Sequence, residues 1–288
     1  MPSPPMPIDR YAVLGNPVAH SRSPFIHTAF AQATGQSLVY ERVLSPMDAF
    51  EATLRRFAAE GGRGCNVTVP FKFDAAAICP RLSDRAMLAG AANVIRFDPE
   101  GWYGDNTDGI GLRTDIEVNA GQPLVGQRVL LIGAGGAAAG VLGPLLEHAP
   151  AEVVVANRSP DKAQALCERH AIWAGQHGSA LRASALSEPG EAFDIVLNAS
   201  ASSLAGSDAP VPGSVLRAGT LAVDLMYGPA AAGFLHWARV RGARAHDGLG
   251  MLVEQAAEAF ALWRGVRPAT APVLAALRAQ LAAEAAAG

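Results

Sequence analysis

The sequence predicts a two-domain α/β protein, in which an N-terminal α/β domain is followed by a doubly wound parallel sheet. Three observations carry this prediction. The chain has 288 residues, which exceeds most single hydrophobic cores and is comfortable for two domains. Strand-like and helix-like segments alternate from Tyr11 onward, as in βαβ units. A glycine-rich turn at 133–138 also joins an apolar strand to a helix.

The first part of the chain contains three strand-like segments with helix-like segments between them. The stretches YAVLG (11–15), LVYERVL (38–44) and GCNVTVP (64–70) are short and mostly rich in β-branched or aromatic residues, so they predict strands. The stretches 23–35 and 46–62 predict helices. This alternation favours βαβ units around a parallel sheet.

The third predicted strand has one polar face. Asn66 and Thr68 alternate with valines, which is the period of a strand, and Pro70 cannot continue as an interior strand residue. Lys72 is therefore expected just beyond the end of a strand. Taken alone, such a lysine is most often a solvated surface charge.

The alternation starts again after a glycine-rich stretch near 104–111. Strands are predicted over 127–133, 151–158, 193–200 and 219–227, with helices from the glycine-rich turn to Leu146 and over 159–170. From 247 onward the chain is predicted to be helical, and we expect these helices to return to the first domain. The predicted domains are residues 1–108 with 247–288, and residues 109–246.

Composition narrows the classes of ligand. Half of the residues are hydrophobic, 17% are charged and the formal net charge is −3. Such a chain has no electrostatic reason to bind nucleic acid or an anionic membrane, and it contains no apolar run long enough to span a bilayer. We expect a small-molecule substrate, no nucleic acid and no membrane.

The cysteines and histidines argue against metal and disulfide frameworks. The three cysteines, Cys65, Cys79 and Cys167, form no CxxC pair, and the seven histidines show no HxxxH spacing. We therefore predict no metal and a reducing compartment. The proline-rich N-terminus lacks the apolar segment of a signal peptide, so the cytoplasm is the expected location.

The glycine-rich turn is the strongest local signal. Residues Gly133, Ala134, Gly135, Gly136 and Ala137 follow the strand QRVLLI and open a helix. Small residues in this position allow a tight turn and bring the backbone against a pyrophosphate at the helix N-terminus. With strand, helix and following strand in place, the pattern predicts a Rossmann-type dinucleotide site rather than a merely structural turn.

The strand after this turn indicates which dinucleotide binds. It ends with Asn157 and Arg158, where an acidic residue would normally bind the ribose 2′-hydroxyl of NAD. Arg158 and Lys162 can instead pair with a 2′-phosphate. We therefore predict NADP, although both could be surface charges and Asp161 nearby leaves room for NAD.

Short polar side chains gather in several loops. Ser21 and Ser23 lie two residues apart and could direct two hydroxyls at one carboxylate. Asn93 ends a run of small residues, and the stretch DNTD at 105–108 lies between glycines. Each stretch alone is equally typical of a hydrogen-bonded turn.

Seven stretches, in this order, resemble the shikimate dehydrogenase family: YAVLGNPVAHSRSPFIH, NVTVPFK, LAGAAN, GDNTDGIG, LIGAGGAA, NRS and DGLGMLVEQAAEAF. The resemblance runs from about residue 11 to residue 268. It implies an enzyme of aromatic amino acid biosynthesis that reversibly reduces 3-dehydroshikimate to shikimate with NADPH.

The resemblance implies roles only for the residues that match it. Lys72 and Asp108 would be the catalytic pair, and two serines would hold the substrate carboxylate. The implied substrate-binding residues are Ser21, Ser23, Asn66, Thr68, Asn93, Tyr227 and Gln255. The implied cofactor-binding residues are Asp84, Gly133, Ala134, Gly135, Gly136, Ala137, Asn157, Arg158, Ser159, Lys162, Leu225 and Gly248.

Two stretches depart from the family pattern. NASASSLAG (198–206) stands where the family usually has Asn-Ala-Thr followed soon by glycine, and GAANV replaces the more usual Val-Asn-Thr. Two alternatives remain: a quinate/shikimate dehydrogenase that uses NAD, and a non-catalytic protein that responds to NADP. Ser23 and the basic pair Arg158 and Lys162 count against the first, and the intact Lys72 and Asp108 count against the second.

Ketone reduction sets the chemistry expected of the catalytic pair. A hydride reaches the carbon while a proton reaches the oxygen, so an acid must lie within hydrogen-bond reach of that oxygen. Lys72 is the candidate donor and Asp108 the candidate orienting group, and which of them is the formal acid stays open. The sequence also leaves open monomer or homodimer, and strictness for shikimate over quinate.

Overall fold

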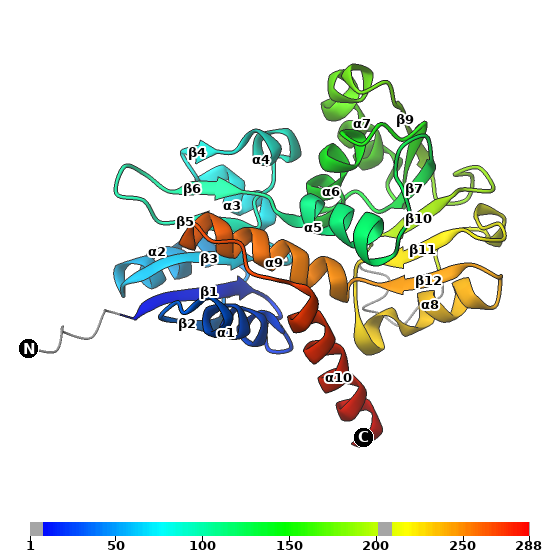
Figure 1. Cartoon of the computed structure of the whole chain (residues 1–288). Helices are drawn as coiled ribbons and strands as arrows, with labels where there is room; N and C mark the ends of the chain where they lie inside the picture. The colour runs from blue at the N-terminus through cyan, green and yellow to red at the C-terminus, as the bar shows by residue number, and fades with distance from the viewer. Residues whose placement is uncertain (1–7, 201–208, 288) are drawn as a thin grey trace, which may run out of the picture. The chain divides into compact units, whose positions relative to one another are not determined.

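The computed structural model describes residues 8–200 and 209–287. The chain divides into two compact units, Met1–Thr107 with Val253–Gly288, and Asp108–Leu252 (Figure 1). NASASSLAG is one of the two stretches that depart from the family pattern, and its residues 201–206 lie outside the described residues.

The first unit is built on a six-stranded sheet with the order β2-β1-β3-β5-β6-β4. Its elements are β1 (Asp9–Gly15), α1 (Ser23–Thr34), β2 (Leu38–Leu44), α2 (Phe50–Ala59), β3 (Gly62–Val67), α3 (Lys72–Ile78), β4 (Arg81–Leu82), α4 (Asp84–Ala89), β5 (Val94–Arg96) and β6 (Tyr103–Asp105). The three predicted strands and two predicted helices are all present. The third strand ends at Val67, so Thr68 lies just beyond it.

This sheet is mixed, whereas the alternating pattern favoured a parallel one. β1 pairs with β2 and β3 in parallel, but β5 runs antiparallel to both β3 and β6. The cause is local: β5 and β6 are joined by residues 97–102, a connection too short for a parallel crossover. Strands of two or three residues carry almost no periodicity, which explains why the pattern did not reveal them.

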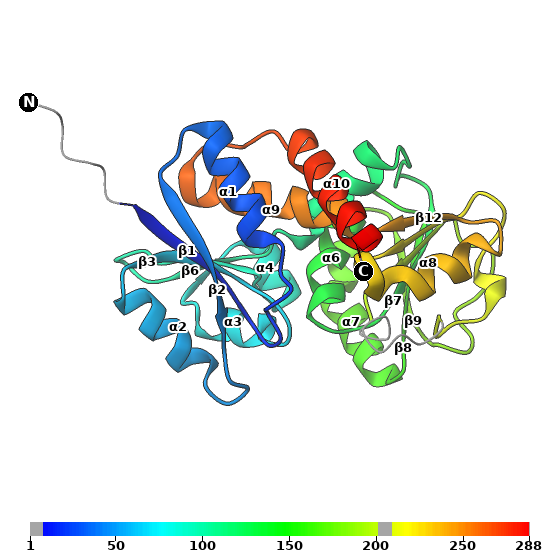
Figure 2. The same ribbon diagram turned by 90° about the horizontal axis from the view of Figure 1, so that it is seen from below.

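The C-terminal helices contact the first unit, as predicted. They are α9 (Leu249–Arg264) and α10 (Ala271–Ala287). Near the end of α9, Trp263 donates to the carbonyl of Ile95 over 3.2 Å and stacks on Tyr11 with ring centroids 4.6 Å apart. Figure 2 shows α10 beside α1, where Arg22 bonds Glu284 over 3.0 Å.

The second unit is an all-parallel sheet with the order β12-β11-β10-β7-β8-β9. Read from β9, this is the Rossmann order 3-2-1-4-5-6, which confirms the predicted fold. Its elements are α5 (Asp108–Thr114), the π-helical turn η1 (Asp115–Asn119), β7 (Arg128–Ile132), α6 (Gly136–Leu146), β8 (Glu152–Asn157), α7 (Pro160–Gln176), β9 (Ala180–Ala185), β10 (Ile195–Asn198), η3 (Gly213–Val215), β11 (Leu221–Asp224), η4 (Gly228–Ala231), α8 (Ala232–Arg239) and β12 (Arg244–Asp247).

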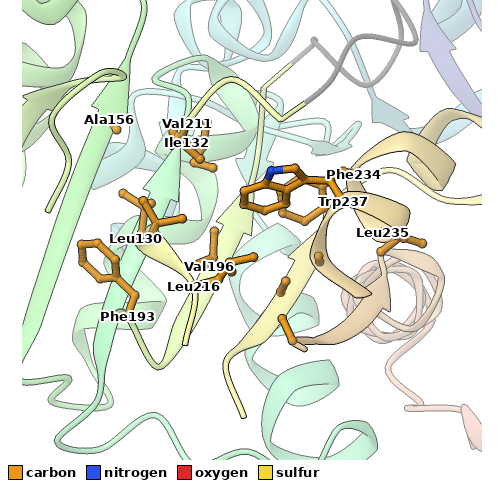
Figure 3. Close-up of a cluster of buried hydrophobic side chains, with 14 of the residues drawn as sticks. Leu130, Ile132, Ala156, Phe193, Val196, Val211, Leu216, Phe234, Leu235 and Trp237 are labelled. Atoms are coloured by element: carbon orange, nitrogen blue, oxygen red, sulfur yellow. The ribbon is translucent and has the colours of Figure 1, made fainter. Parts of the chain in front are cut away.

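A core of buried side chains fixes this second sheet. On one face, Leu130 and Ile132 of β7 belong to the same cluster as Val196 of β10 and as Phe234 and Trp237 of α8 (Figure 3). The alternate residues of β7 are buried as well, so the strand is covered on both faces, as in a central parallel strand. The strand end that carries the glycine-rich turn is therefore anchored in the core.

Candidate active site

The two predicted serines lie side by side where the loop after β1 meets the start of α1. The Oγ of Ser21 donates to the Oγ of Ser23 over 3.2 Å. Arg42, on β2, donates twice to the backbone carbonyl of Ser21, at 2.9 and 2.6 Å. At the other end of the loop, the side chain of Asn16 donates to the carbonyl of Ser45 over 2.9 Å. These bonds hold the loop at both ends, and the two neighbouring hydroxyls can bind one carboxylate.

Asn66 lies near the end of β3 and is buried between two hydrogen-bonding partners. Its Oδ1 accepts from the hydroxyl of Tyr40 over 2.6 Å, and its Nδ2 donates to the carbonyl of Asn93 over 3.3 Å. Burial holds the pKa of Tyr40 well above its usual range, so this hydroxyl keeps its proton. Thr68, just past the strand, is fixed by a backbone bond to the carbonyl of Leu14 at 2.9 Å.

Asn93 joins the predicted substrate residues of the first unit. Its Oδ1 accepts from the backbone N–H of Thr107 over 2.8 Å. Its Nδ2 lies 3.1 Å from the Oγ1 of Thr107 and 3.2 Å from the Oε1 of Gln255. Gln255 is buried on α9 and hydrogen-bonded to this cluster. We call Ser21, Ser23, Tyr40, Asn66, Asn93, Thr107 and Gln255 the polar network.

Lys72 and Asp108 each begin a helix. Lys72 is the first residue of α3 and is half-buried, and its carbonyl accepts from the N–H of Ala92 over 2.8 Å. Its backbone therefore lies beside the segment that leads into Asn93. Asp108 follows Thr107 directly, is buried and opens α5 of the second unit.

An ion pair between the half-buried Arg85 and the buried Asp105 holds the turn that precedes Asp108. Arg85 donates its Nε to the Oδ1 of Asp105 over 2.7 Å and its Nη2 to the Oδ2 over 2.5 Å. The hydroxyl of Ser83 and the N–H of Asn106 also donate to this carboxylate, at 2.5 and 2.7 Å. Burial alone would raise the pKa of Asp105, but these donors and the charge of Arg85 hold it below its usual value.

His27 of α1 stacks on Tyr40, with ring centroids 4.2 Å apart and ring planes within 3°. Complete burial lowers the pKa of His27 to about 3, and the nearby Asn66 offsets only part of that effect, so the ring is neutral. Neither ring nitrogen has a hydrogen-bond partner of ordinary geometry among the described residues. His27 therefore acts here as a packing surface.

The predicted glycine-rich turn follows β7 in the second unit. Gly133 has a φ of +111°, and a Cβ there would lie 3.1 Å from the carbonyl carbon and oxygen of Ala199. Over Gly135 a Cβ would meet nothing within 4 Å. The turn is thus narrow at Gly133 and open at Gly135, which suits the close approach of a pyrophosphate at the start of α6. Ala134, between these positions, and Gly136 and Ala137, after them, are half-buried.

The predicted 2′-phosphate residues lie where β8 passes into α7. Asn157 is half-buried, and its Nδ2 donates to the carbonyl of Ser159 over 3.0 Å. Ser159 in turn accepts from the backbone N–H of Lys162 over 3.1 Å. Arg158, Ser159 and Lys162 are exposed. The two cations can therefore reach a phosphate group without a prior change in burial.

The remaining predicted residues of the second unit follow β11 and β12. A Cβ on Gly248 would lie 2.3 Å from the carbonyl oxygen of Leu225, so only glycine allows these two turns to meet. Tyr227 is half-buried just before η4. Because β7, β8, β11 and β12 are parallel, the residues that follow them lie at one edge of the sheet, where open α/β sheets bind ligands.

Asp84 stands apart from these groups in its setting. It is exposed at the start of α4, after Ser83, whose hydroxyl caps that helix.

The sequence alone did not identify Tyr40 or Arg85 as residues of the site. The signal for Tyr40 was weak: a tyrosine within a strand combines an apolar ring with a polar tip that needs a partner when buried.

Among residues 8–200 and 209–287, no three His, Cys, Asp or Glu side chains form a group that could hold a metal ion. Across the same residues, no helix has the length and apolar character needed to cross a membrane.

Three family models match the chain. The shikimate dehydrogenase substrate binding domain matches residues 13–95, shikimate / quinate 5-dehydrogenase matches residues 117–207, and the shikimate 5'-dehydrogenase C-terminal domain matches residues 248–278. A shikimate dehydrogenase (NADP(+)) of Methylibium petroleiphilum is 61% identical over 277 residues, which cover 94% of each chain. One of Acidovorax sp. is 61% identical over 275 residues, or 96% of this chain and 98% of the relative.

Solved structures agree with these matches. Shikimate 5-dehydrogenase from Thermus thermophilus, in complex with NADP(H) and shikimate, is 34% identical with a TM-score of 0.82, covering 94% of this chain and 99% of that one. An Ael1 enzyme from Pseudomonas putida is 48% identical with a TM-score of 0.82, over 93% and 98% of the two chains. The chain described here belongs to the family of NADP-dependent shikimate dehydrogenases.

Proposed function

We propose that this chain performs the reaction of its family, the reversible reduction of 3-dehydroshikimate to shikimate with NADPH, in aromatic amino acid biosynthesis. The polar network of the first unit is the observation that supports this most. It offers hydroxyl groups suited to a carboxylate and amide groups suited to ring hydroxyls, and its members are already bonded to one another.

We assign the substrate to residues 1–108 with 247–288, and NADP to residues 109–246. Ser21 and Ser23 would bind the carboxylate. The ring hydroxyls would be bound by Asn66, Thr68, Asn93 and Gln255, with Tyr227 also facing the substrate. NADP would be bound by Gly133 to Ala137, Asn157 to Ser159, Lys162, Leu225 and Gly248, with Asp84 near the cofactor.

Lys72 is the proposed proton donor to the substrate oxygen, with Asp108 as the orienting carboxylate. Composition supports a specific role for this amine, because the chain has two lysines and 21 arginines. An arginine keeps its proton in proteins, whereas a lysine can release one. Lys72 is thus one of only two side-chain amines in the chain, and the other, Lys162, is assigned to the 2′-phosphate.

The reduced nicotinamide, when bound, supplies the hydride that reaches the carbonyl carbon of the substrate. The chain's own residues supply the rest. The serines and the amides of the polar network orient the substrate. Lys72 transfers a proton to the carbonyl oxygen of the substrate as negative charge develops there. In the oxidative direction, the same amine accepts the proton of the hydroxyl.

Preference for NADP over NAD rests on Arg158 and Lys162. Both are exposed at the end of β8 and the start of α7, and β8 ends in Asn157 instead of an acidic residue. A 2′-phosphate gains charge-assisted hydrogen bonds there. The 2′-hydroxyl of NAD carries no charge, so it gains less from these two cations.

A four-way activity assay tests the function. Shikimate and quinate are each offered with NADP and with NAD, and formation of reduced nicotinamide is followed by absorbance. We expect the highest kcat/KM for shikimate with NADP. Highest activity with quinate and NAD would favour the rival dehydrogenase, and no activity in any mixture would favour the non-catalytic NADP-responsive protein.

Assembly and location stay predictions. We propose a monomer or homodimer, which light scattering of the purified chain would distinguish. A cytoplasmic location is supported by Cys65, Cys79 and Cys167, which are all buried free thiols.

A further inference from the structure

We infer that Tyr40 is a positioning residue for the substrate. Its hydroxyl fixes the orientation of the Asn66 amide, so that the amide directs an N–H at the substrate, and it couples that amide to the serine pair. The inference rests on the proposed function, because it assumes that Asn66 binds a substrate hydroxyl.

The partners of Asn66 determine which way its amide faces. The backbone carbonyl of Asn93 can only accept a hydrogen bond, so the Nδ2 of Asn66 must face it, at 3.3 Å. The Oδ1 then faces Tyr40, whose hydroxyl lies 2.6 Å away and must donate. Tyr40 thus orients the Oδ1, and the second N–H of the Asn66 amide is the donor that Asn66 can offer to a substrate hydroxyl.

Tyr40 also connects this amide to the carboxylate end of the network. Ser23 lies within hydrogen-bonding reach of the Tyr40 hydroxyl and offsets part of the effect of burial on its pKa. Ser23 accepts in turn from Ser21 over 3.2 Å. One phenol therefore sets the relative placement of the two groups of residues that we assign to the carboxylate and to a ring hydroxyl.

The surroundings of Tyr40 keep its hydroxyl in place. The ring stacks on the neutral His27 at 4.2 Å and belongs to a buried cluster with Tyr11, Val13 and Val18. On the neighbouring strand, Tyr11 is its direct register partner. A side chain locked by packing on a strand holds a hydrogen bond more accurately than one on a loop.

Steady-state kinetics of Tyr40→Phe tests the inference, because this change removes only the hydroxyl. We expect the KM for shikimate to rise about 3- to 10-fold, the size of one net hydrogen bond, with kcat within about twofold. The KM for NADP should not change. In an Asn66→Ala background, Tyr40→Phe should raise the KM for shikimate less than it does in the wild type, because only its effect through Ser23 remains.

Tyr11→Phe is the matched control. It removes a hydroxyl from the same buried cluster, where the partner is Arg264 at 3.4 Å, and it should leave the KM for shikimate unchanged. An unchanged KM in Tyr40→Phe, or an equal rise with and without Asn66, would overturn the inference while leaving the function intact. An inactive wild-type chain would instead refute the function.

A crystal structure of the wild-type chain with shikimate gives a second test that does not depend on folding of the variant. We expect the Tyr40 hydroxyl to remain bonded to the Oδ1 of Asn66. We also expect the Nδ2 of Asn66 to donate to a hydroxyl oxygen of shikimate. A structure in which the Nδ2 of Asn66 bonds no oxygen of shikimate, or in which the Tyr40 hydroxyl no longer bonds the Oδ1 of Asn66, would contradict the inference.

Discussion

The two units differ in the kind of residue that we propose for ligand binding. In the first unit, the proposed substrate residues are mostly buried polar side chains that bond one another, such as Asn66, Asn93 and Gln255. In the second unit, the proposed cofactor residues are mainly glycines and alanines, with exposed charges at Arg158 and Lys162. Truncating a side chain should therefore damage the first, whereas adding a Cβ or reversing a charge should damage the second.

Lys72→Ala is expected to have the largest effect on the substrate side. Loss of a positioned acid should lower kcat by about 10²- to 10⁴-fold, with a much smaller change in the KM for shikimate. Steady-state kinetics in the oxidative direction measures both. Lys72→Arg is the matched control, since it keeps the charge and cannot release a proton. If Lys72→Arg retained most of the wild-type kcat, a role in proton transfer would be ruled out.

Arg85→Met tests how far the first unit depends on its buried charges. The change leaves Asp105 buried without its cation, so we expect the free energy of unfolding to fall by about 3–5 kcal/mol near pH 7 in denaturant titrations. Arg55→Met removes a partner from the exposed pair with Glu51 and should cost less than about 0.5 kcal/mol. Equal losses for the two variants would contradict this account of Asp105.

The same pair predicts a dependence of stability on pH. The pKa of Asp105 is lowered on folding, so its contribution is complete above the ordinary value of about 3.9 and is lost as the pH falls through the lower folded value. The difference in unfolding free energy between wild type and Arg85→Met should therefore shrink in acid. A difference that grew below about pH 4 would have the wrong sign.

Gly133→Ala tests the backbone-built turn of the second unit. The backbone at residue 133 has a φ of +111°, which alanine rarely adopts. The added methyl group would also lie 3.1 Å from the carbonyl of Ala199. We expect a rise of about tenfold or more in the KM for NADP and a loss of about 1–3 kcal/mol in stability. Gly121→Ala also has a positive φ, +63°, but open space around the Cβ, and should affect only stability.

Arg158→Glu should have the smallest effect of these changes. Replacing an exposed cation by an anion should lower the NADP-to-NAD ratio of kcat/KM by about 3- to 10-fold, more at low salt than at high salt. Arg169→Glu, an exposed position on the same helix α7, is the control and should leave the ratio unchanged. An unaltered ratio in Arg158→Glu would refute the assignment of the 2′-phosphate site.

The sequence predicted what depends on local order. Three signals lie within a few residues: the β-branched and aromatic composition of β2, the glycine-rich turn, and the end of the third strand near Pro70. The structure contains each of these elements. The polar network was less accessible, because its bonds join residues far apart: Tyr40 and Asn66 are 26 positions apart, and Asn93 and Gln255 are 162 apart. No periodicity reports such pairings. The antiparallel β5 was missed for a similar reason, since it is a three-residue strand defined by its neighbours.

The scarcity of lysine has a practical consequence for spectroscopy. Lys72 is half-buried at the start of α3, while Lys162 is exposed on α7. Reductive methylation with isotope-labelled formaldehyde would give one side-chain resonance in each unit, apart from that of the terminal amine. The protein thus carries one natural reporter in each unit. Adding shikimate or NADP stepwise and following the two resonances would distinguish binding of the substrate from binding of the cofactor, without any engineered label.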